Sequence, residues 1–258
     1  GVVFEGDVLI ENEFIVEIAP SISPKIASCK IIDAEGNYLI PGAIDDQVHF
    51  REPGLTHKAD IFTESRAAIA GGITSFMEMP NTVPNALTQG LLEDKYQIAS
   101  QTSLANYSFF MGASNDNYDE VMRTICPDVC GIKIFMGSST GNMLVDAPEV
   151  LEKLFSNAPC LIATHCEDEP TVRQRTAIFK EQYGENVPYD IHALVRNEEA
   201  CYKSSAMAVD LAKKHGTRLH ILHISTGEET NLFEVGNYGN SQVSLARSEE
   251  RRVGKECL

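Results

Sequence analysis

The chain of 258 residues is 43% hydrophobic and 22% charged, which is typical of a globular protein and excludes a disordered or fibrous chain. Its formal net charge of −16 makes nucleic acid an unfavourable partner, because proteins bind a phosphate backbone through Lys and Arg. No apolar run reaches the roughly 20 residues of a membrane-spanning helix, and no secretory pattern opens the chain, so we expect a cytoplasmic protein that does not bind a membrane. The seven scattered cysteines favour reduced thiols over a disulfide framework.

Residues 1–41 predict a small β domain. Four short runs of alternating or β-branched residues lie between Gly, Pro and polar residues, as expected of strands joined by turns. These runs are Val8–Ile10, Phe14–Ile18, Lys30–Ile32 and Tyr38–Ile40. The chain begins with Gly1, without an initiator Met and already in strand-like sequence, so we interpret this domain as partial.

Residues 42–246 repeat a pattern of apolar strand, loop and amphipathic helix. Six strands are expected, at Ala43–Val48, Thr74–Glu78, Asn106–Phe110, Gly131–Phe135, Leu161–His165 and Leu219–His223. Helices are expected at Ile61–Ala70, Pro148–Phe155 and Glu198–His215. Strands that alternate with helices form parallel sheets. About six such units without an obvious end favour an incomplete α/β barrel of the (β/α)8 TIM type over a complete open sheet.

The last residues, 247–258, form a dense charged run without apolar periodicity. A solvated polar tail is one explanation, but the string RSEERRVGKEC also matches the in-frame translation of a sequencing adapter. We therefore expect a non-native tail that packs against nothing, with native sequence ending near Leu245.

Polar residues lie at the strand ends of the predicted barrel. In the first strand Asp45, Gln47 and His49 are two residues apart, so an extended backbone points all three the same way. Three later strands also end in an ionisable residue: Lys133, His165 and His223. A single His in such a place is usually a hydrogen-bonded structural residue. In a (β/α)8 barrel, however, the carboxyl ends of the strands build the active site, so these groups are expected to converge.

Two positions need a further argument. His220 and His223 are three residues apart, which places them on opposite faces of a strand. We assign His223 inward, because it ends the strand and shares its face with Leu219 and Ile221, and His220 outward or behind the site. Lys133 has no lone pair for a metal while it is an ammonium. It is either a buried Lys with a carboxylate partner or an amine that reacts with carbon dioxide to form a carbamate, which can bridge two metal ions.

Several motifs together resemble the dihydroorotases of the cyclic amidohydrolase superfamily, over about residues 2–245. The motifs are PGAIDDQVHFREPG, MPNT, GIKIFMGSSTGNM, THCEDE, EEACYKSSAMAVDLAKK and HILHIST. The resemblance implies a metal-bearing barrel with a small β domain built from both chain ends. It implies one or two Zn²⁺ held by the following residues: His49, Lys133 as a carboxylated lysine, His165 and His223. Arg51 and Asn81 match the groups that hold the substrate carboxylate, a role that suits the planar fork of Arg.

The implied activity is zinc-dependent, reversible hydrolysis of the cyclic amide of dihydroorotate to N-carbamoyl-aspartate in pyrimidine biosynthesis. Two departures from the family bear on it. Gln47 replaces the first His of the family's His-x-His motif, and an amide oxygen is a poor zinc ligand, so one metal site is expected to be weak or empty. The family's catalytic Asp ends strand eight, beyond this sequence. No residue is therefore assigned as general base, and the fragment alone is expected to be inactive.

Two alternatives remain open. One is another cyclic amidohydrolase, such as an allantoinase or a dihydropyrimidinase, although Arg51 and Asn81 argue against a neutral ring as substrate. The other is a non-catalytic relative that serves as a partner of aspartate transcarbamoylase, which Gln47 supports and Lys133 argues against. The partner is otherwise a small-molecule substrate, and a homodimer is left open. The acidic run Glu167–Glu169 is expected to be a solvated loop.

Overall fold

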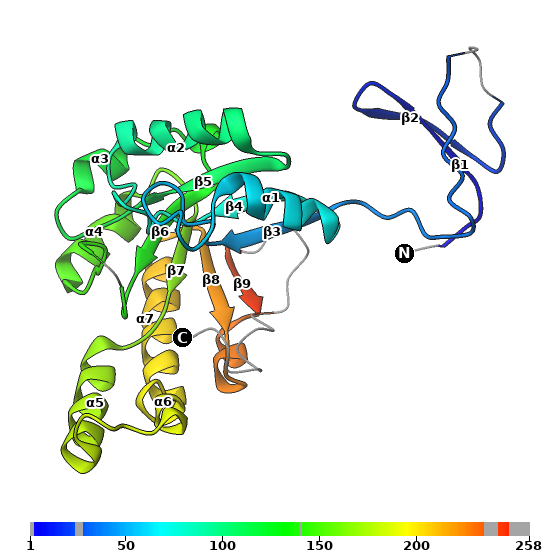
Figure 1. Cartoon of the computed structure of the whole chain (residues 1–258). Helices are drawn as coiled ribbons and strands as arrows, with labels where there is room; N and C mark the ends of the chain where they lie inside the picture. Colours follow the sequence, from blue (N-terminus) through cyan, green and yellow to red (C-terminus); the bar gives the residue numbers. More distant parts are fainter. Residues whose placement is uncertain (1–2, 24–27, 140, 235–241, 248–258) are drawn as a thin grey trace. The chain divides into compact units, whose positions relative to one another are not determined.

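The computed structural model describes residues 3–23, 28–139, 141–234 and 242–247 (Figure 1). It divides into two compact units, Gly1–Pro41 and Gly42–Leu258. Residues 248–258, most of the expected tail, lie outside the described residues. Within the described part of the chain, no helix has the length and apolar character to cross a membrane.

In the first unit, β1 (Asp7–Glu11) pairs antiparallel with β2 (Phe14–Ala19). Asn12 takes a left-handed conformation at the two-residue turn, with φ 56°, which Asn tolerates better than most residues. The runs Lys30–Ile32 and Tyr38–Ile40 are not strands, so this part of the prediction was wrong. A β-branched pattern is insufficient, because a strand needs a neighbour to pair its backbone groups, and the large apolar side chains of both runs are exposed.

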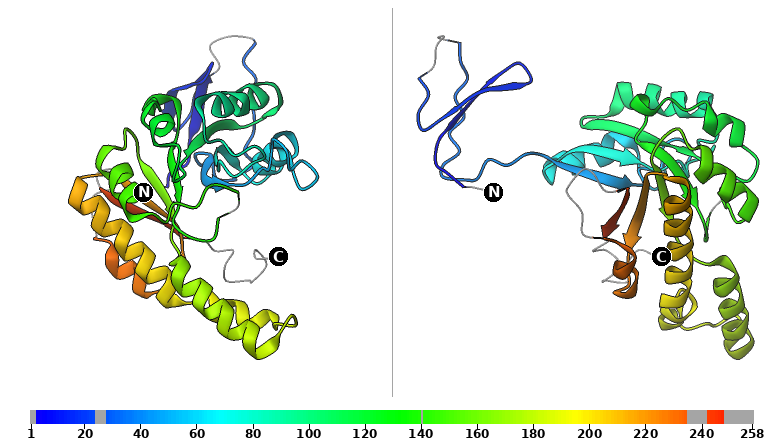
Figure 2. Two further views of the ribbon diagram at one scale, coloured as in Figure 1. Left: turned by 90° about the vertical axis from the view of Figure 1, so that its left-hand side faces the viewer. Right: turned by 180° about the vertical axis from the view of Figure 1, so that it is seen from behind.

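The second unit contains a seven-stranded parallel sheet in which each strand pairs with its neighbours in the chain (Figures 1 and 2). The strands are β3 (Ala43–Val48), β4 (Ile73–Glu78), β5 (Asn106–Gly112), β6 (Gly131–Phe135), β7 (Ile162–His165), β8 (Leu219–Ile224) and β9 (Val243–Arg247). The six predicted strands are all present. β9 is a seventh strand that the sequence analysis did not resolve, and Arg247, which was assigned to the tail, is its last residue.

Helices fill the connections between the strands. They are α1 (Ile61–Ala70), α2 (Gln89–Thr102), α3 (Tyr118–Met122), η1 (Cys126–Asp128), α4 (Pro148–Asn157), α5 (Glu169–Tyr183), η2 (Tyr189–Ile191), α6 (His192–Val195), α7 (Glu198–His215) and η3 (Glu228–Leu232). Asp60 caps α1 by accepting a hydrogen bond from the Thr63 backbone N–H at 2.7 Å. Gly216 ends α7 in the left-handed conformation, with φ 72°. These local signals explain why the predicted bounds of α1 and α7 agree with the structure.

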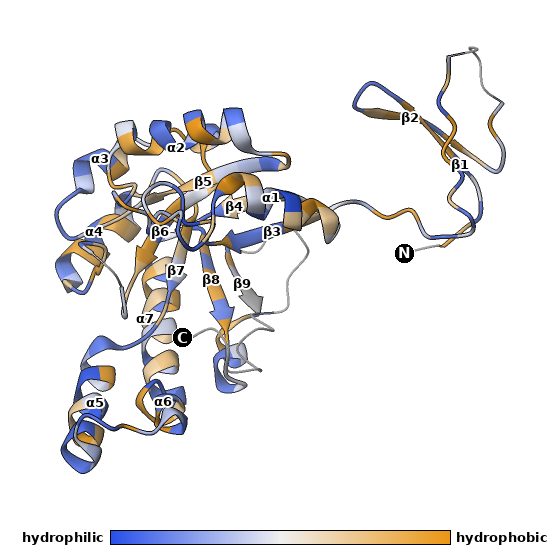
Figure 3. Cartoon of the chain, viewed as in Figure 1, coloured by the Kyte–Doolittle hydropathy of each residue, from blue (hydrophilic) through white to orange (hydrophobic). Residues whose placement is uncertain are grey.

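Successive strand residues face two different apolar clusters. The larger cluster combines strand residues such as Phe76 and Ile132 with buried residues of α1, α2, α4 and α7, so it marks the face that the helices cover. The smaller cluster lies on the opposite face, and its buried members are Met79, Phe110, Ala163 and Leu222. Hydrophobic residues accordingly run along β6, while β3 and α5 are largely hydrophilic (Figure 3).

A long-range hydrogen bond shows that the sheet is curled. Asp46 Oδ2 on β3 lies 3.0 Å from His220 Nε2 on β8, although these strands are not neighbours in the sheet. A curled parallel sheet with helices on its outer face is part of a (β/α)8 barrel. This confirms the predicted α/β fold class.

Cys126 and Cys160 form a disulfide, with Cα atoms 5.3 Å apart. The expectation that all the cysteines are reduced thiols was therefore wrong. Cys126 precedes β6 and Cys160 precedes β7, and neighbouring parallel strands begin at the same edge of the sheet. The pairing follows from this topology, which the separation of 34 residues in the sequence does not reveal.

Candidate metal centre

His165 and His223 meet at the carboxyl edge of the sheet. Nδ1 of His165 lies 3.0 Å from Nε2 of His223, and the ring centroids are 4.8 Å apart. Lys133 on β6 is the register partner of Ala163, which is two residues before His165 on β7. Residues two apart on a strand share a face, so Lys133 lies on the same face as His165. The structure thus brings His165 and His223 together and places Lys133 on the same face of the neighbouring strand, at the end of the sheet where barrel active sites lie.

His223 reaches this edge in a way that the sequence analysis did not predict. Leu219 and Ile221 belong to the cluster under the helices, so regular alternation would place His223 on the outer face with them. Its φ of 42° and a register shift between Ile221 and Ile224 break that alternation. The broken strand turns His223 toward His165. The argument from strand parity was therefore wrong, although the side chain lies where it was expected.

His220 was expected to lie outward or behind the site, and it lies on the inner face of the sheet, so the outward alternative was wrong. Its Nε2 contacts Asp46 Oδ2 at 3.0 Å, and its Nδ1 contacts Ser244 Oγ on β9 at 2.8 Å. Leu222, two residues further along, belongs to the inner apolar cluster. His220 therefore bridges three strands, and both of its ring nitrogens are used away from His165.

Lys133 places a buried amine on the strand next to that of His165. The residue is 1% exposed, and its Nζ has no hydrogen-bond partner and lies 4.4 Å from the centroid of the Phe135 ring. The carboxylate partner that was considered for Lys133 is not found among the described residues. Burial lowers the pKa of Lys133 to about 7, against an opposing effect of Cys166. Burial therefore favours the neutral form of the amine, which is able to act as a nucleophile.

His49 is held by Asn81. Nδ1 of His49 lies 2.9 Å from Oδ1 of Asn81, so Nδ1 donates and the lone pair of the neutral ring is on Nε2. Burial and the charge of Arg51, with a smaller effect of Lys133, lower the pKa of His49 to about 4. Arg51 itself has φ 68°, a left-handed conformation that is uncommon for a residue with a side chain. The structure thus gathers Arg51 and Asn81 around His49.

The strand is irregular at Gln47. The register of β3 with β4 shifts between Asp45 and Val48, and the Gln47 backbone N–H donates to Asp45 Oδ1 at 3.1 Å. The expectation that Asp45, Gln47 and His49 follow one face by simple alternation was therefore wrong. Asp side chains commonly bond the backbone two residues further along, and here that bond accompanies the break in the ladder.

Glu167 is a site residue that the sequence analysis missed. It is buried, and its Oε2 accepts from His165 Nε2 at 2.9 Å and from Arg196 Nη1 at 2.7 Å. Burial alone would raise the pKa of Glu167, but the hydrogen bond from His165 and the charge of Arg196 lower it to about 2. The available signal was its position two residues beyond a strand-end His, within reach of that ring.

The other acidic residues of this run also have structural partners, so the expectation of a solvated loop was wrong. Asp168 caps α5 by accepting from the Thr171 backbone N–H at 3.0 Å. Glu169 Oε2 accepts from the Ser138 backbone N–H at 2.9 Å. The run therefore connects β7, α5 and the loop after β6.

The geometry fits a zinc ion if Lys133 changes its chemical form. Among the described residues, no three His, Cys, Asp or Glu side chains lie close enough together to hold a metal. Zinc–nitrogen bonds of about 2.0–2.1 Å place tetrahedral ligands about 3.3 Å apart, close to the separation of His165 and His223. The bond from His165 to Glu167 also matches the carboxylate that usually orients a zinc-binding imidazole. Lys133 can supply a further ligand only as an anion, because an ammonium has no lone pair.

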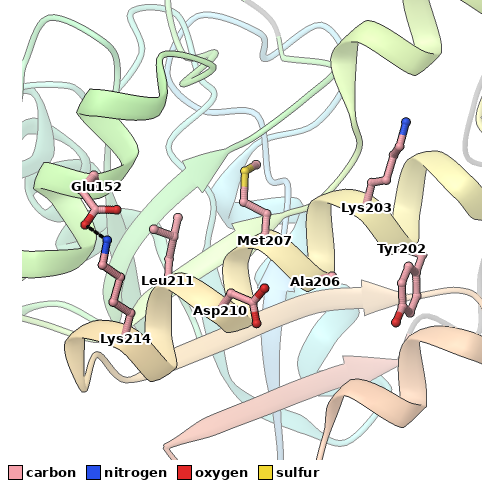
Figure 4. Close-up of a pocket in the computed structure, with 8 residues that line it drawn as sticks. All are labelled: Glu152, Tyr202, Lys203, Ala206, Met207, Asp210, Leu211 and Lys214. Atoms are coloured by element: carbon pink, nitrogen blue, oxygen red, sulfur yellow. Dashed lines mark hydrogen bonds and ion pairs between the residues drawn. The ribbon is translucent and has the colours of Figure 1, made fainter.

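A separate hollow of about 460 Å³ lies between α4 and α7 (Figure 4). An ion pair between Lys214 and Glu152 closes one end of it. None of the strand-end residues lines this hollow, so it is distinct from the candidate metal centre.

Comparisons with known proteins relate the chain to dihydroorotases and allantoinases. No family model matches the sequence. A dihydroorotase from Methanosarcina acetivorans is 31% identical over 256 residues, which are 98% of this chain and 52% of that protein. An allantoinase from Deinococcus radiodurans is 29% identical over 247 residues, 93% of this chain and 54% of that protein. The chain thus spans about half the length of the curated relatives it matches.

Solved structures share the fold. The L-hydantoinase (dihydropyrimidinase) from Arthrobacter aurescens superposes with a TM-score of 0.82 at 24% identity, over 88% of this chain and 51% of that one. At this identity the match shows the fold alone. Taken together, the comparisons show that the chain is similar in sequence to dihydroorotases and allantoinases and shares its fold with a hydantoinase.

Proposed function

We propose that this chain forms most of the active site of a dihydroorotase, which opens the cyclic amide of dihydroorotate to N-carbamoyl-aspartate. The observation that carries the proposal is the buried Lys133 amine, which has no hydrogen-bond partner and lies on the strand next to that of His165. A structural Lys would be expected to have a carboxylate beside it. A dihydroorotase relative that matches 98% of the chain supports the same interpretation.

The neutral Lys133 amine can add to carbon dioxide. Its lone pair forms a bond from nitrogen to carbon, one N–H proton is released, and the product is an anionic carbamate. This anion, His165, His223 and the Nε2 lone pair of His49 would hold one or two zinc ions. When bound, zinc lowers the pKa of a water from 15.7 to about 7 and polarises a carbonyl oxygen.

Arg51 and Asn81 are proposed to hold the substrate carboxylate. A guanidinium donates two parallel hydrogen bonds to a carboxylate, which gives both orientation and affinity. The charge of Arg51 acts on His49, and Asn81 contacts His49 directly, so both groups lie beside a proposed metal ligand. This arrangement favours a ring that bears a carboxylate over a neutral ring.

In this proposal the enzyme works in pyrimidine biosynthesis, mainly in the ring-closing direction, and in the cytoplasm. A homodimer is the assembly to test. No residue of this chain is assigned as the general base, so the chain alone is expected to be inactive. Activity is to be measured in a protein that spans the full length of the relatives.

Replacement of Arg51 tests the choice of substrate. Arg51→Met should raise KM for dihydroorotate by roughly tenfold or more, because hydrogen bonds to a charged group are lost. Arg51→Lys keeps the charge without the planar fork and should give a smaller increase. Zinc content measured by elemental analysis should not change in either variant. An unchanged KM in Arg51→Met would contradict the proposed role.

Replacement of Gln47 separates the enzyme from a non-catalytic partner of aspartate transcarbamoylase, the alternative that Gln47 favours. Gln47→His should raise zinc occupancy or the rate at limiting zinc, because imidazole binds zinc better than a neutral amide does. The wild type should still hold at least one zinc through Lys133, His165 and His223. Zinc content and dihydroorotate hydrolysis of both proteins provide the measurement. A wild type without zinc and without turnover in excess metal would support the scaffold instead.

A further inference from the structure

A buried ion pair lies behind the loops that carry Arg51 and Asn81. Glu78, at the end of β4, and Lys95, on α2, are each 1% exposed, and Lys95 Nζ contacts Glu78 Oε2. Lys95 Nζ also donates to the backbone carbonyl of Met79 at 2.9 Å. The pair belongs to the face that the helices cover, so it does not touch the proposed metal ligands.

The pair is connected to both loops through the backbone. The Glu78 carboxylate faces the backbone N–H groups of Phe50 and Arg51, which follow His49 directly. Met79, which Lys95 holds by its carbonyl, donates its own N–H to the Val48 carbonyl at 3.0 Å. Asn81 is two residues beyond Met79.

The backbone conformation at Arg51 requires stabilising contacts. Its φ of 68° is unfavourable for a residue with a Cβ and persists only where surrounding contacts hold it. The Glu78 carboxylate, which lies opposite these two successive N–H groups, provides such a contact, because a charged acceptor attracts an N–H donor more strongly than a neutral acceptor does. Burying an ion pair is costly, and apolar side chains of similar size would pack at least as well. The charged pair is therefore better explained by the two N–H groups than by packing.

We propose that Glu78 and Lys95 are positioning residues that set the Arg51 and Asn81 loops for recognition of a carboxylate-bearing ring. We expect the pair to increase the affinity for that substrate and to leave the affinity for the metal unchanged. This inference rests on the proposed function for the identity of the substrate, whereas the effect on the Arg51 backbone does not depend on it.

Two double variants test the pair while removing both buried charges. Glu78→Gln with Lys95→Met keeps a carbonyl oxygen opposite the two N–H groups, and Glu78→Leu with Lys95→Met removes it. Comparison of the two isolates the acceptor, because neither leaves an unpaired buried charge. Amide hydrogen exchange at Phe50 and Arg51 should be roughly tenfold or more faster in the Leu variant than in the Gln variant. Exchange in the core of α7 should be equal in both, which shows that each protein is folded.

Kinetics give the second measurement. In the full-length protein, the Leu variant should have a KM for dihydroorotate roughly tenfold or more above that of the Gln variant, with similar kcat and equal zinc content. Equal exchange at Phe50 and Arg51 in the two variants would overturn the inference. Faster exchange with an unchanged KM would overturn the role in recognition. If the wild type hydrolyses no cyclic amide, the proposed function fails, and the exchange result still decides the role of the pair.

Discussion

Lys133→Ala should lower dihydroorotate hydrolysis by more than about 100-fold and reduce the zinc content. Loss of a group that merely orients a ligand lowers metal affinity by about 10–100-fold, and loss of a ligand itself should exceed that. The amine is buried, has no hydrogen-bond partner and has a pKa lowered to about 7, so the variant removes no ion pair. The fold should therefore remain intact, which circular dichroism can check.

A short carboxylic acid should restore part of the activity of Lys133→Ala, because its carboxylate can occupy the place of the carbamate. Lys133→Arg is the matched control: it keeps a cation of similar length, but a guanidinium does not form the carbamate, so it should be inactive and not rescued. Full activity of Lys133→Arg would exclude the carbamate. Loss of zinc without any rescue by acids would leave the carbamate unsupported.

Glu167→Leu should weaken zinc binding by about 10–100-fold, the usual effect of removing a carboxylate that orients a metal-binding imidazole. The variant removes the acceptor that holds His165 Nε2 at 2.9 Å, so the ring is free to turn away from His223. Arg196 loses the same partner, but its side chain is 30% exposed and can be hydrated, so most of the fold should survive. Zinc affinity is measured by competition with a chelator.

Two further variants control for the role of Glu167. Glu167→Gln keeps an oxygen that can accept from His165 and should lose less affinity than Glu167→Leu. Glu181→Leu changes an exposed carboxylate on α5 and should bind zinc like the wild type. If Glu167→Leu bound zinc as tightly as Glu181→Leu, Glu167 would have no part in the site.

Much of the secondary structure follows from the sequence because its causes are local. α1 and α7 have the predicted bounds because Asp60 caps the first turn of one and Gly216 ends the other in a conformation that Gly adopts without strain. The later predicted strands, such as Gly131–Phe135, are largely apolar runs of the length that a buried parallel sheet requires. The sequence also predicted that His165 and His223 lie close together, because the carboxyl ends of parallel strands meet at one edge of the sheet.

The remaining features depend on contacts between residues that are distant in the chain. The side of β8 that His223 occupies was decided by a break in the strand, and strand periodicity cannot predict such a break. The sequence shows Glu167 only as part of an acidic run. In the folded chain it is buried and paired with His165 and Arg196. The same limit applies to Cys126 and Cys160, which meet because parallel strands begin at one edge. Local sequence by itself determined most of the strands and helices of the second unit, whereas the tertiary structure decided which polar groups are buried and paired, because desolvation and pairing depend on the whole fold.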